Sequence, residues 1–123
     1  MEPMTLHRSI AGTLVALGVL HLVLGIYWSW EVWVRVAHEG FFDAIDPWMD
    51  RNAAFWFTYL SLPIIFAGVL CLRLLKDTGK PLPRSVSLWL VGLGAIGAFF
   101  MPASGFVILI ILGALALLPV KVR

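Results

Sequence analysis

Charged side chains are missing from three long stretches of this sequence. Aspartate, glutamate, lysine and arginine together make up 13% of the 123 residues, about half the share found in an ordinary soluble domain. None of them occurs in residues 9–30, 52–72 or 85–120, and 61% of the whole chain is hydrophobic. Such stretches exclude the core of a small soluble protein and favour helices that cross a membrane.

The sequence also lacks the residues on which several common chemistries depend. Its single cysteine, Cys71, excludes an internal disulfide and a cysteine-based metal framework. It contains no P-loop, nucleophile elbow, zinc-binding helix or dinucleotide fingerprint. We therefore predict no metal, no cofactor and no catalytic residue, and the balance weighs against an enzyme. The pI of about 9.0 reflects loop charges, so we expect no nucleic-acid partner.

The apolar stretches predict four membrane spans. A helix needs about 20 residues to cross a hydrocarbon core ~30 Å thick. The last stretch has 36 residues, too many for one crossing, and Pro102–Gly105 suits a tight turn within it. The predicted spans are residues 9–30, 52–75, 82–101 and 102–119. The expected fold is all-α: one membrane domain over residues 1–123, built as a four-helix bundle.

The charges between the spans indicate an orientation. Residues 31–51 contain five acidic side chains against two arginines, whereas residues 73–84 contain four basic side chains against one aspartate. Lysine and arginine mark the cytoplasmic side of a membrane protein, and the segments outside the first and last spans are also basic. We therefore predict that both termini lie in the cytoplasm.

The outer connection contains a predicted amphipathic helix, over about residues 30–39. Glu31 and Arg35 are spaced as a favourable i,i+4 pair on its polar face. Trp33 and Val34 lie on the opposite face, and Gly40 is a natural stop. We expect the helix to lie on the membrane or to continue the first span outward, and Asp50 to be a candidate cap for the second span.

Five tryptophans fall near the predicted outer boundary: Trp28, Trp30, Trp33, Trp48 and Trp56. Indole rings prefer this amphipathic zone, so anchoring explains them without a ligand. A stacking site for a ligand is the sharper alternative.

His21 is the only histidine within a predicted span, and an ionisable residue in a span is a functional-site hypothesis by default. It lies roughly 13 Å below the outer boundary at the standard helical rise. Gly18 and Gly25 share its face, which indicates close approach of another helix. No second histidine lies at this depth, which weighs against a haem.

Two interpretations of His21 remain open. A neutral imidazole could be hydrogen-bonded to Ser61, to Thr58 or to the carbonyl of Tyr59, which Pro63 leaves without its helical donor. Alternatively, His21 contacts a ligand or handles protons. The candidate ligand contacts are His21, Trp28, Trp56, Thr58 and Ser61.

A second candidate is the outer charged cluster, which consists of Asp43, Asp46, Asp50 and Arg51. Its acids could bind a cation or a basic partner, but their spacing matches no known cation loop. A solvated loop is the simpler interpretation. Arg51 could pair with these acids or extend to the lipid headgroups.

Several short segments resemble one uncharacterised bacterial family of small four-span membrane proteins, a domain of unknown function. They are His21–Gly25, Gly40–Ile45, Arg51–Phe57, Pro81–Arg84 and Met101–Phe106. This resemblance implies four spans in a bacterial cytoplasmic membrane and supplies no activity. A more distant resemblance is to the DoxX-like four-helix membrane proteins, which implies a redox or quinone-linked setting.

These observations favour a non-catalytic membrane subunit or a module that binds a lipid-like or quinone-like ligand. A small dimeric transporter with His21 as the titrating group is an alternative, and a membrane enzyme with His21 as a base is another. The expected partners are the lipid bilayer, such a ligand, and a second copy or a larger membrane complex.

Overall fold

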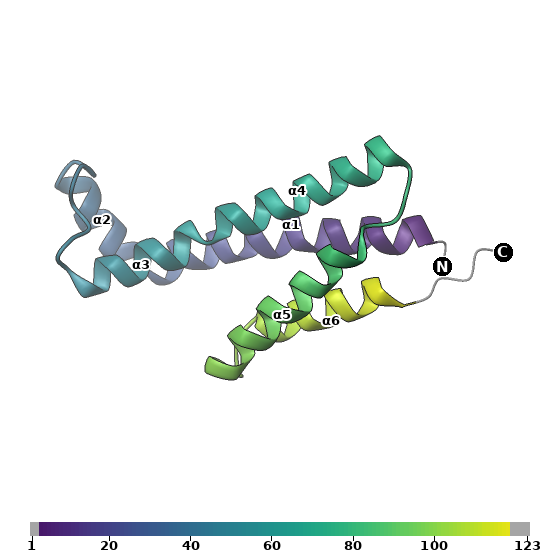
Figure 1. Ribbon diagram of the computed structural model, residues 1–123. Helices are drawn as coiled ribbons and strands as arrows, with labels where there is room; N and C mark the ends of the chain where they lie inside the picture. Colours follow the sequence, from purple (N-terminus) through teal and green to yellow (C-terminus); the bar gives the residue numbers. More distant parts are fainter. Residues whose placement is uncertain (1–2, 119–123) are drawn as a thin grey trace. The chain divides into compact units, whose positions relative to one another are not determined.

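The computed structural model describes residues 3–118 of the chain, and over this range the protein is all-α, without a strand. Figure 1 shows its six helices in chain order. They are α1 (Pro3–Trp28), α2 (Trp30–His38), α3 (Met49–Tyr59), α4 (Ser61–Thr78), α5 (Arg84–Phe100) and α6 (Phe106–Leu117). The predicted fold class is confirmed at this level. The last residue of the predicted fourth span, Pro119, lies outside the described residues.

Two helices are long and apolar enough to cross a membrane. They are Met4–Trp28, with 25 residues, and Met49–Thr78, with 30 residues. The second comprises α3 and α4, which only Leu60 separates. Both contain a predicted span, and each extends beyond it toward the basic end.

The four-span bundle is not confirmed. α5 has 17 residues and α6 has 12, which correspond to about 26 Å and 18 Å at the helical rise. Both are shorter than a ~30 Å hydrocarbon core. The turn lies where it was predicted, but it uses five residues, 101–105, that the predicted spans had counted as helix. Pro83 adopts an extended conformation and delays the start of α5 to Arg84.

The chain divides into two compact units. Unit 1 comprises residues 1–12 and 70–123, and unit 2 comprises residues 13–69. Both α1 and α4 therefore contribute to each unit. The candidate site residues predicted from the sequence all belong to unit 2.

Unit 1 is organised around a small apolar cluster and a close helix pair. Ala11, Cys71, Leu75 and Leu82 form the cluster. Beside it, the buried His7 accepts a hydrogen bond at Nδ1 from the backbone N–H of Leu82, 3.3 Å away. This bond joins the start of α1 to the connection between α4 and α5, and the sequence gave no indication of it.

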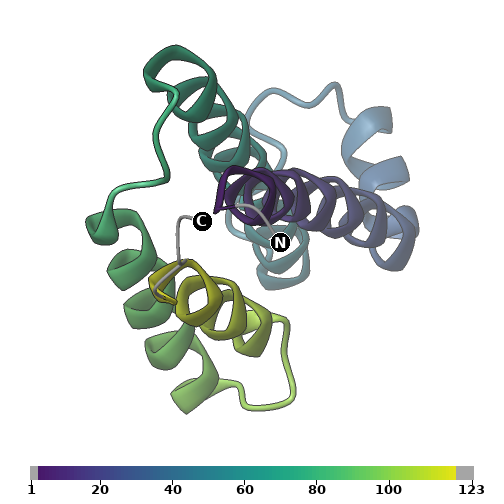
Figure 2. The same cartoon turned by 90° about the vertical axis from the view of Figure 1, so that its right-hand side faces the viewer.

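The α5–α6 hairpin of unit 1 depends on glycine. Figure 2 shows the two helices side by side, joined by the turn at residues 101–105. A Cβ on Gly94 would lie 2.8 Å from the backbone nitrogen of Ile110, and one on Gly113 would lie 2.7 Å from the carbonyl oxygen of Ser87. The glycines of α5 therefore set a close helix approach, as their mid-span positions indicated.

Unit 2 is a pair of helices that run past each other, α1 against α3 and the start of α4 (Figure 1). A Cβ on Gly18 would lie 2.8 Å from the backbone nitrogen of Ile65, and one on Gly25 would lie 2.8 Å from Thr58 Oγ1. The stripe of small residues on α1 thus faces protein, as predicted, and it brings His21 against the second helix.

The connection between α1 and α3 contains the predicted short helix. α2 begins after a bend at Ser29 and leaves the line of α1, so it does not continue the first span straight outward (Figure 1). It ends at His38, and Gly40 follows with a φ of +91° that favours glycine.

Two local predictions for this connection are wrong. Arg35 forms its ion pair with Asp50, at 2.7 Å, rather than with Glu31. Asp50 is not the cap of α3, because the capping position is occupied by Trp48, whose side chain makes no capping hydrogen bond. The tertiary pair with Arg35 therefore replaces both local interactions.

Candidate functional site

The centre of the candidate ligand site is the imidazole of His21, stacked on the ring of Phe57. The two ring centroids are 4.0 Å apart and the planes differ by 23°. Phe57 also lies near Trp28, with centroids 6.1 Å apart. Gly25, one turn beyond His21, leaves room for Phe57 and Thr58 to approach α1.

Two polar atoms in this interface have no hydrogen-bond partner. His21 Nε2 and Thr58 Oγ1 are both buried and unpaired. Leaving a buried donor or acceptor unpaired typically costs about 1–3 kcal/mol. The interface therefore contains two groups that any suitable hydrogen-bonding partner would stabilise.

The predicted hydrogen bond between His21 and the second helix is not formed. The hydroxyl of Ser61 instead donates to the carbonyl of Thr58, at 2.5 Å. Ser61 follows the helix break at Leu60, so a free helical carbonyl lies within its reach. The imidazole meets the apolar ring of Phe57 rather than a polar group.

The structure brings together four of the five predicted ligand contacts. His21, Thr58 and Ser61 lie at the α1–α3–α4 interface, and Trp28 lies beside it through Phe57. Trp56 does not join them: its ring is exposed, and its Nε1 donates to Asn52 Oδ1 at 3.1 Å.

Phe57 is the site residue that the sequence analysis missed. It lies four residues before Ser61 and therefore on the same face of the second helix. The same spacing argument that selected Ser61 and Thr58 would have selected it. It was passed over because an apolar ring in an apolar helix carries no chemical signal of its own.

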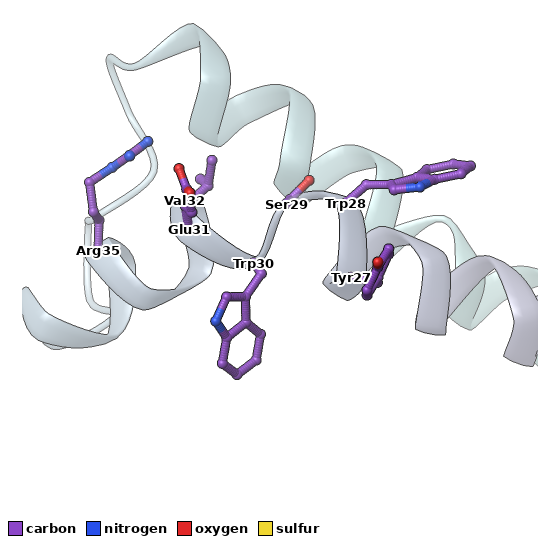
Figure 3. Close-up of a pocket in the computed structure, with 7 residues that line it drawn as sticks. All are labelled: Tyr27, Trp28, Ser29, Trp30, Glu31, Val32 and Arg35. Carbon is purple, nitrogen blue, oxygen red and sulfur yellow. The ribbon is translucent and has the colours of Figure 1, made fainter.

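A hollow of about 630 Å³ lies at the junction of α1 and α2. It is lined by Tyr27, Trp28, Ser29, Trp30, Glu31, Val32 and Arg35. Figure 3 shows these side chains diverging around the bend, with Trp30 directed away from Arg35 and Glu31. The hollow follows from the change of helix direction, and its polar groups do not converge on a common point.

The outer charged cluster is organised differently from the prediction. The guanidinium of Arg51 donates to both carboxylate oxygens of Glu39, at 2.5 Å and 2.7 Å, and to the carbonyl of Ala44 at 2.7 Å. Arg51 is 7% exposed, and it also lies 5.6 Å from the ring centroid of Trp48. Arg51 thus fastens the connection to α3, through a glutamate that was not among the candidates.

The three aspartates of the cluster do not gather. Asp50 pairs with Arg35, and Asp46 accepts a hydrogen bond from the side chain of Asn52. Asp43 is exposed, with a φ of +54°. Within residues 3–118, no group of three or more histidine, cysteine or acidic side chains is placed to hold a metal ion. The aspartates therefore serve the connection as separate surface groups.

Arg51 changes the acidity of its partner. Its hydrogen bond to Glu39, followed by its positive charge, lowers the pKa of this carboxyl below the ordinary value, against a smaller opposing contribution from desolvation. Glu39 therefore stays ionised over the physiological range and keeps the pair intact.

Comparison with protein families gives one match. A family of unknown function, DUF6463, matches the chain over residues 5–122. The chain belongs to this family. The resemblance to an uncharacterised family is thereby confirmed, while the DUF6463 description itself carries no activity, no number of spans and no link to DoxX-like proteins. Comparison with curated proteins and with solved structures gives no match.

Proposed function

We propose that this DUF6463 protein is a non-catalytic, multi-pass subunit of the bacterial cytoplasmic membrane that holds a lipid-type or quinone-type ligand beside His21. The observation that carries the proposal is the pair of unpaired buried atoms, His21 Nε2 and Thr58 Oγ1, in one apolar helix interface. Ligand sites are usually apolar, with a few placed polar groups. In hydrocarbon no water is present to satisfy such groups, so a ligand that does so gains directly.

The membrane setting is supported by the exposed apolar surface. In the most apolar windows of the two long helices, only 28% and 17% of the residues are buried inside the protein. Patches of this extent on monomeric soluble proteins are rare. Lipid is the solvent that matches them.

Within this proposal the chain is one membrane domain with four spans. Residues 82–101 and 102–119 then form a short hairpin, and both ends of the hairpin lie on the same side. If α5 and α6 enter the bilayer without crossing it, the number of full crossings remains even. Both termini are therefore cytoplasmic in either case, and the acidic connection between α1 and α3 lies outside.

A labelling experiment tests this topology. In a Cys71→Ser chain, Asp43→Cys and Lys80→Cys each place one thiol in a loop. We expect a membrane-impermeant maleimide to label position 43 in intact spheroplasts and to label position 80 only after lysis. Labelling of position 80 before lysis would contradict the orientation.

The ligand site is tested by native mass spectrometry of protein released from the membrane in mild detergent. We expect a specific small molecule or lipid to accompany the protein, with occupancy roughly tenfold lower in His21→Ala, because the contact is worth on the order of 1 kcal/mol or more. His38→Ala is the matched control, since His38 is exposed on α2.

A second pair of variants separates ligand loss from misfolding. Thr58→Val keeps the side-chain shape and removes the buried hydroxyl, while Thr13→Val makes the same change at an exposed position of α1. Thr58→Val should reduce occupancy without lowering the melting temperature. An equal occupancy in all four variants, or no specific ligand at all, would sink the proposal.

A further inference from the structure

We infer that Phe57 covers a binding site for a flat, carbonyl-bearing ring, which takes the place of Phe57 on the imidazole of His21. This inference rests on the proposed ligand site and adds the class of ligand. It separates a planar ring from the acyl chains and phosphate groups that other lipids would offer.

The stacking geometry shows what the imidazole accepts on its face. Phe57 lies nearly parallel to His21, with centroids 4.0 Å apart and planes 23° apart. This is the offset-stacked type of arrangement that aromatic pairs favour. Trp28 borders the same ring at a tilt of 51°, so a flat ring in this position would be enclosed by aromatic surfaces.

The unpaired atoms show what Phe57 fails to supply. His21 Nε2 and Thr58 Oγ1 are buried in the interface around this ring. A neutral imidazole can donate a hydrogen bond from Nε2, and a threonine hydroxyl can donate another. A carbonyl oxygen has two lone pairs and accepts from both, whereas a phenyl ring accepts from neither in this way. A ring that carries a carbonyl therefore satisfies the stacking surface and the polar atoms together.

The helix that carries Phe57 is weakly joined to the next one. α3 ends at Tyr59 and α4 begins at Ser61, with Leu60 between them. Pro63 has no N–H for the carbonyl of Tyr59, and the Ser61 hydroxyl binds the Thr58 carbonyl instead of a helical N–H doing so alone. The last turn of α3 can therefore shift without breaking a continuous hydrogen-bond ladder, and the Phe57 ring can leave the imidazole by rotation about χ1.

The test uses two probes that differ only in their carbonyls. They are 2,3-dimethyl-1,4-naphthoquinone and 2,3-dimethylnaphthalene, titrated into full-length Cys71→Ser protein in lipid nanodiscs with ¹⁵N-labelled histidine. The His21 resonance is assigned by its loss in His21→Ala. We expect saturable binding of the quinone with a shift of the His21 ring nitrogens, and no saturable shift with the hydrocarbon.

The variants of Phe57 give the sign of its role. Removing a ring that competes for the site should tighten quinone binding in Phe57→Ala by about threefold to tenfold, the worth of one aromatic stack. Phe57→Trp should weaken it. Phe55→Ala is the control, because Phe55 stacks on Tyr59 within the same helix and does not meet His21. Phe57→Leu keeps most of the volume if the alanine variant does not fold.

The outcomes distinguish this inference from the proposed function. Weaker quinone binding in both Phe57→Ala and Phe57→Leu makes Phe57 a wall of the site and overturns the inference. Equal shifts with both probes remove the carbonyl requirement and also overturn it. If neither probe binds but a lipid still copurifies in a His21-dependent manner, the ring class is wrong and the ligand site stands. If nothing binds and nothing copurifies, both fail.

Discussion

Gly18→Ala should loosen unit 2 more than any other single-methyl change in α1. The added Cβ would lie 2.8 Å from the backbone nitrogen of Ile65, 3.1 Å from the carbonyl oxygen of Ser61 and 2.5 Å from Ile65 Cγ1. The isoleucine side chain can rotate, but the backbone atoms belong to α4 and move only if the helix moves. Overpacking of this kind costs about 1–3 kcal/mol.

The matched control is Gly12→Ala in the same helix. Nothing lies within 4 Å of a Cβ on Gly12, and alanine is the better helix former by up to about 1 kcal/mol. In mild detergent, thermal unfolding followed by tryptophan fluorescence should show a lower midpoint for Gly18→Ala and an unchanged or higher midpoint for Gly12→Ala. If the two variants unfold together, the close approach of α1 and α4 is wrong.

Loss of Gly18 should also affect the candidate site. His21 lies one turn beyond Gly18 on the same face, so moving α1 away from α4 draws the imidazole away from Phe57. Ligand occupancy in Gly18→Ala should therefore fall although no ligand contact has been changed. Gly12→Ala should leave occupancy unaltered.

The sequence was sufficient to predict the elements that depend on pattern. Long charge-free stretches gave the two long helices, Gly40 gave the end of α2, and Pro102–Gly105 gave the turn between α5 and α6. Each of these follows from local chemistry: helical hydrophobicity, a positive φ, or a residue that stops a helix.

What depends on partners distant in the chain could not be predicted in the same way. Arg51 has five acidic residues within reach in the sequence, and nothing in their spacing selects Glu39. The choice requires the turn at Gly40 that folds the end of α2 back toward α3, so that a carboxylate meets both guanidinium nitrogens. The missing bond between His21 and Ser61 has the same origin, because a break at Leu60 redirected the hydroxyl.

The second large effect is expected at Arg51. Arg51→Ala removes three hydrogen bonds at once, two to Glu39 and one to the carbonyl of the buried Ala44. That carbonyl would then lack its side-chain donor, and the connection would lose its attachment to α3. We expect faster hydrogen–deuterium exchange over residues 40–48 and a lower thermal midpoint. Arg51→Lys should recover little, since an ammonium group cannot bind both carboxylate oxygens in the planar fork of arginine.

Arg35→Ala provides the control for charge alone. It removes one ion pair, with Asp50, in which both side chains are about half exposed, at 49% and 53%. Exposed pairs of this kind contribute little to stability. Exchange over residues 40–48 should therefore stay close to that of the unaltered protein. A larger effect in Arg35→Ala than in Arg51→Ala would show that net charge, rather than the buried guanidinium, holds the connection.

The pH dependence of this protection separates the two explanations further. Because Arg51 lowers the pKa of Glu39, the pair contributes its full stability above the ordinary glutamate pKa of about 4.3. That contribution is lost as the pH falls below this value and through the lowered pKa of Glu39. After correction for the intrinsic exchange rate, residues 40–48 should therefore lose protection in this acidic window. In Arg51→Ala the carboxyl has no preferred ionised partner, so the same window should show no comparable loss. An acid-dependent step that persists without Arg51 would assign the titration to another carboxylate of the connection.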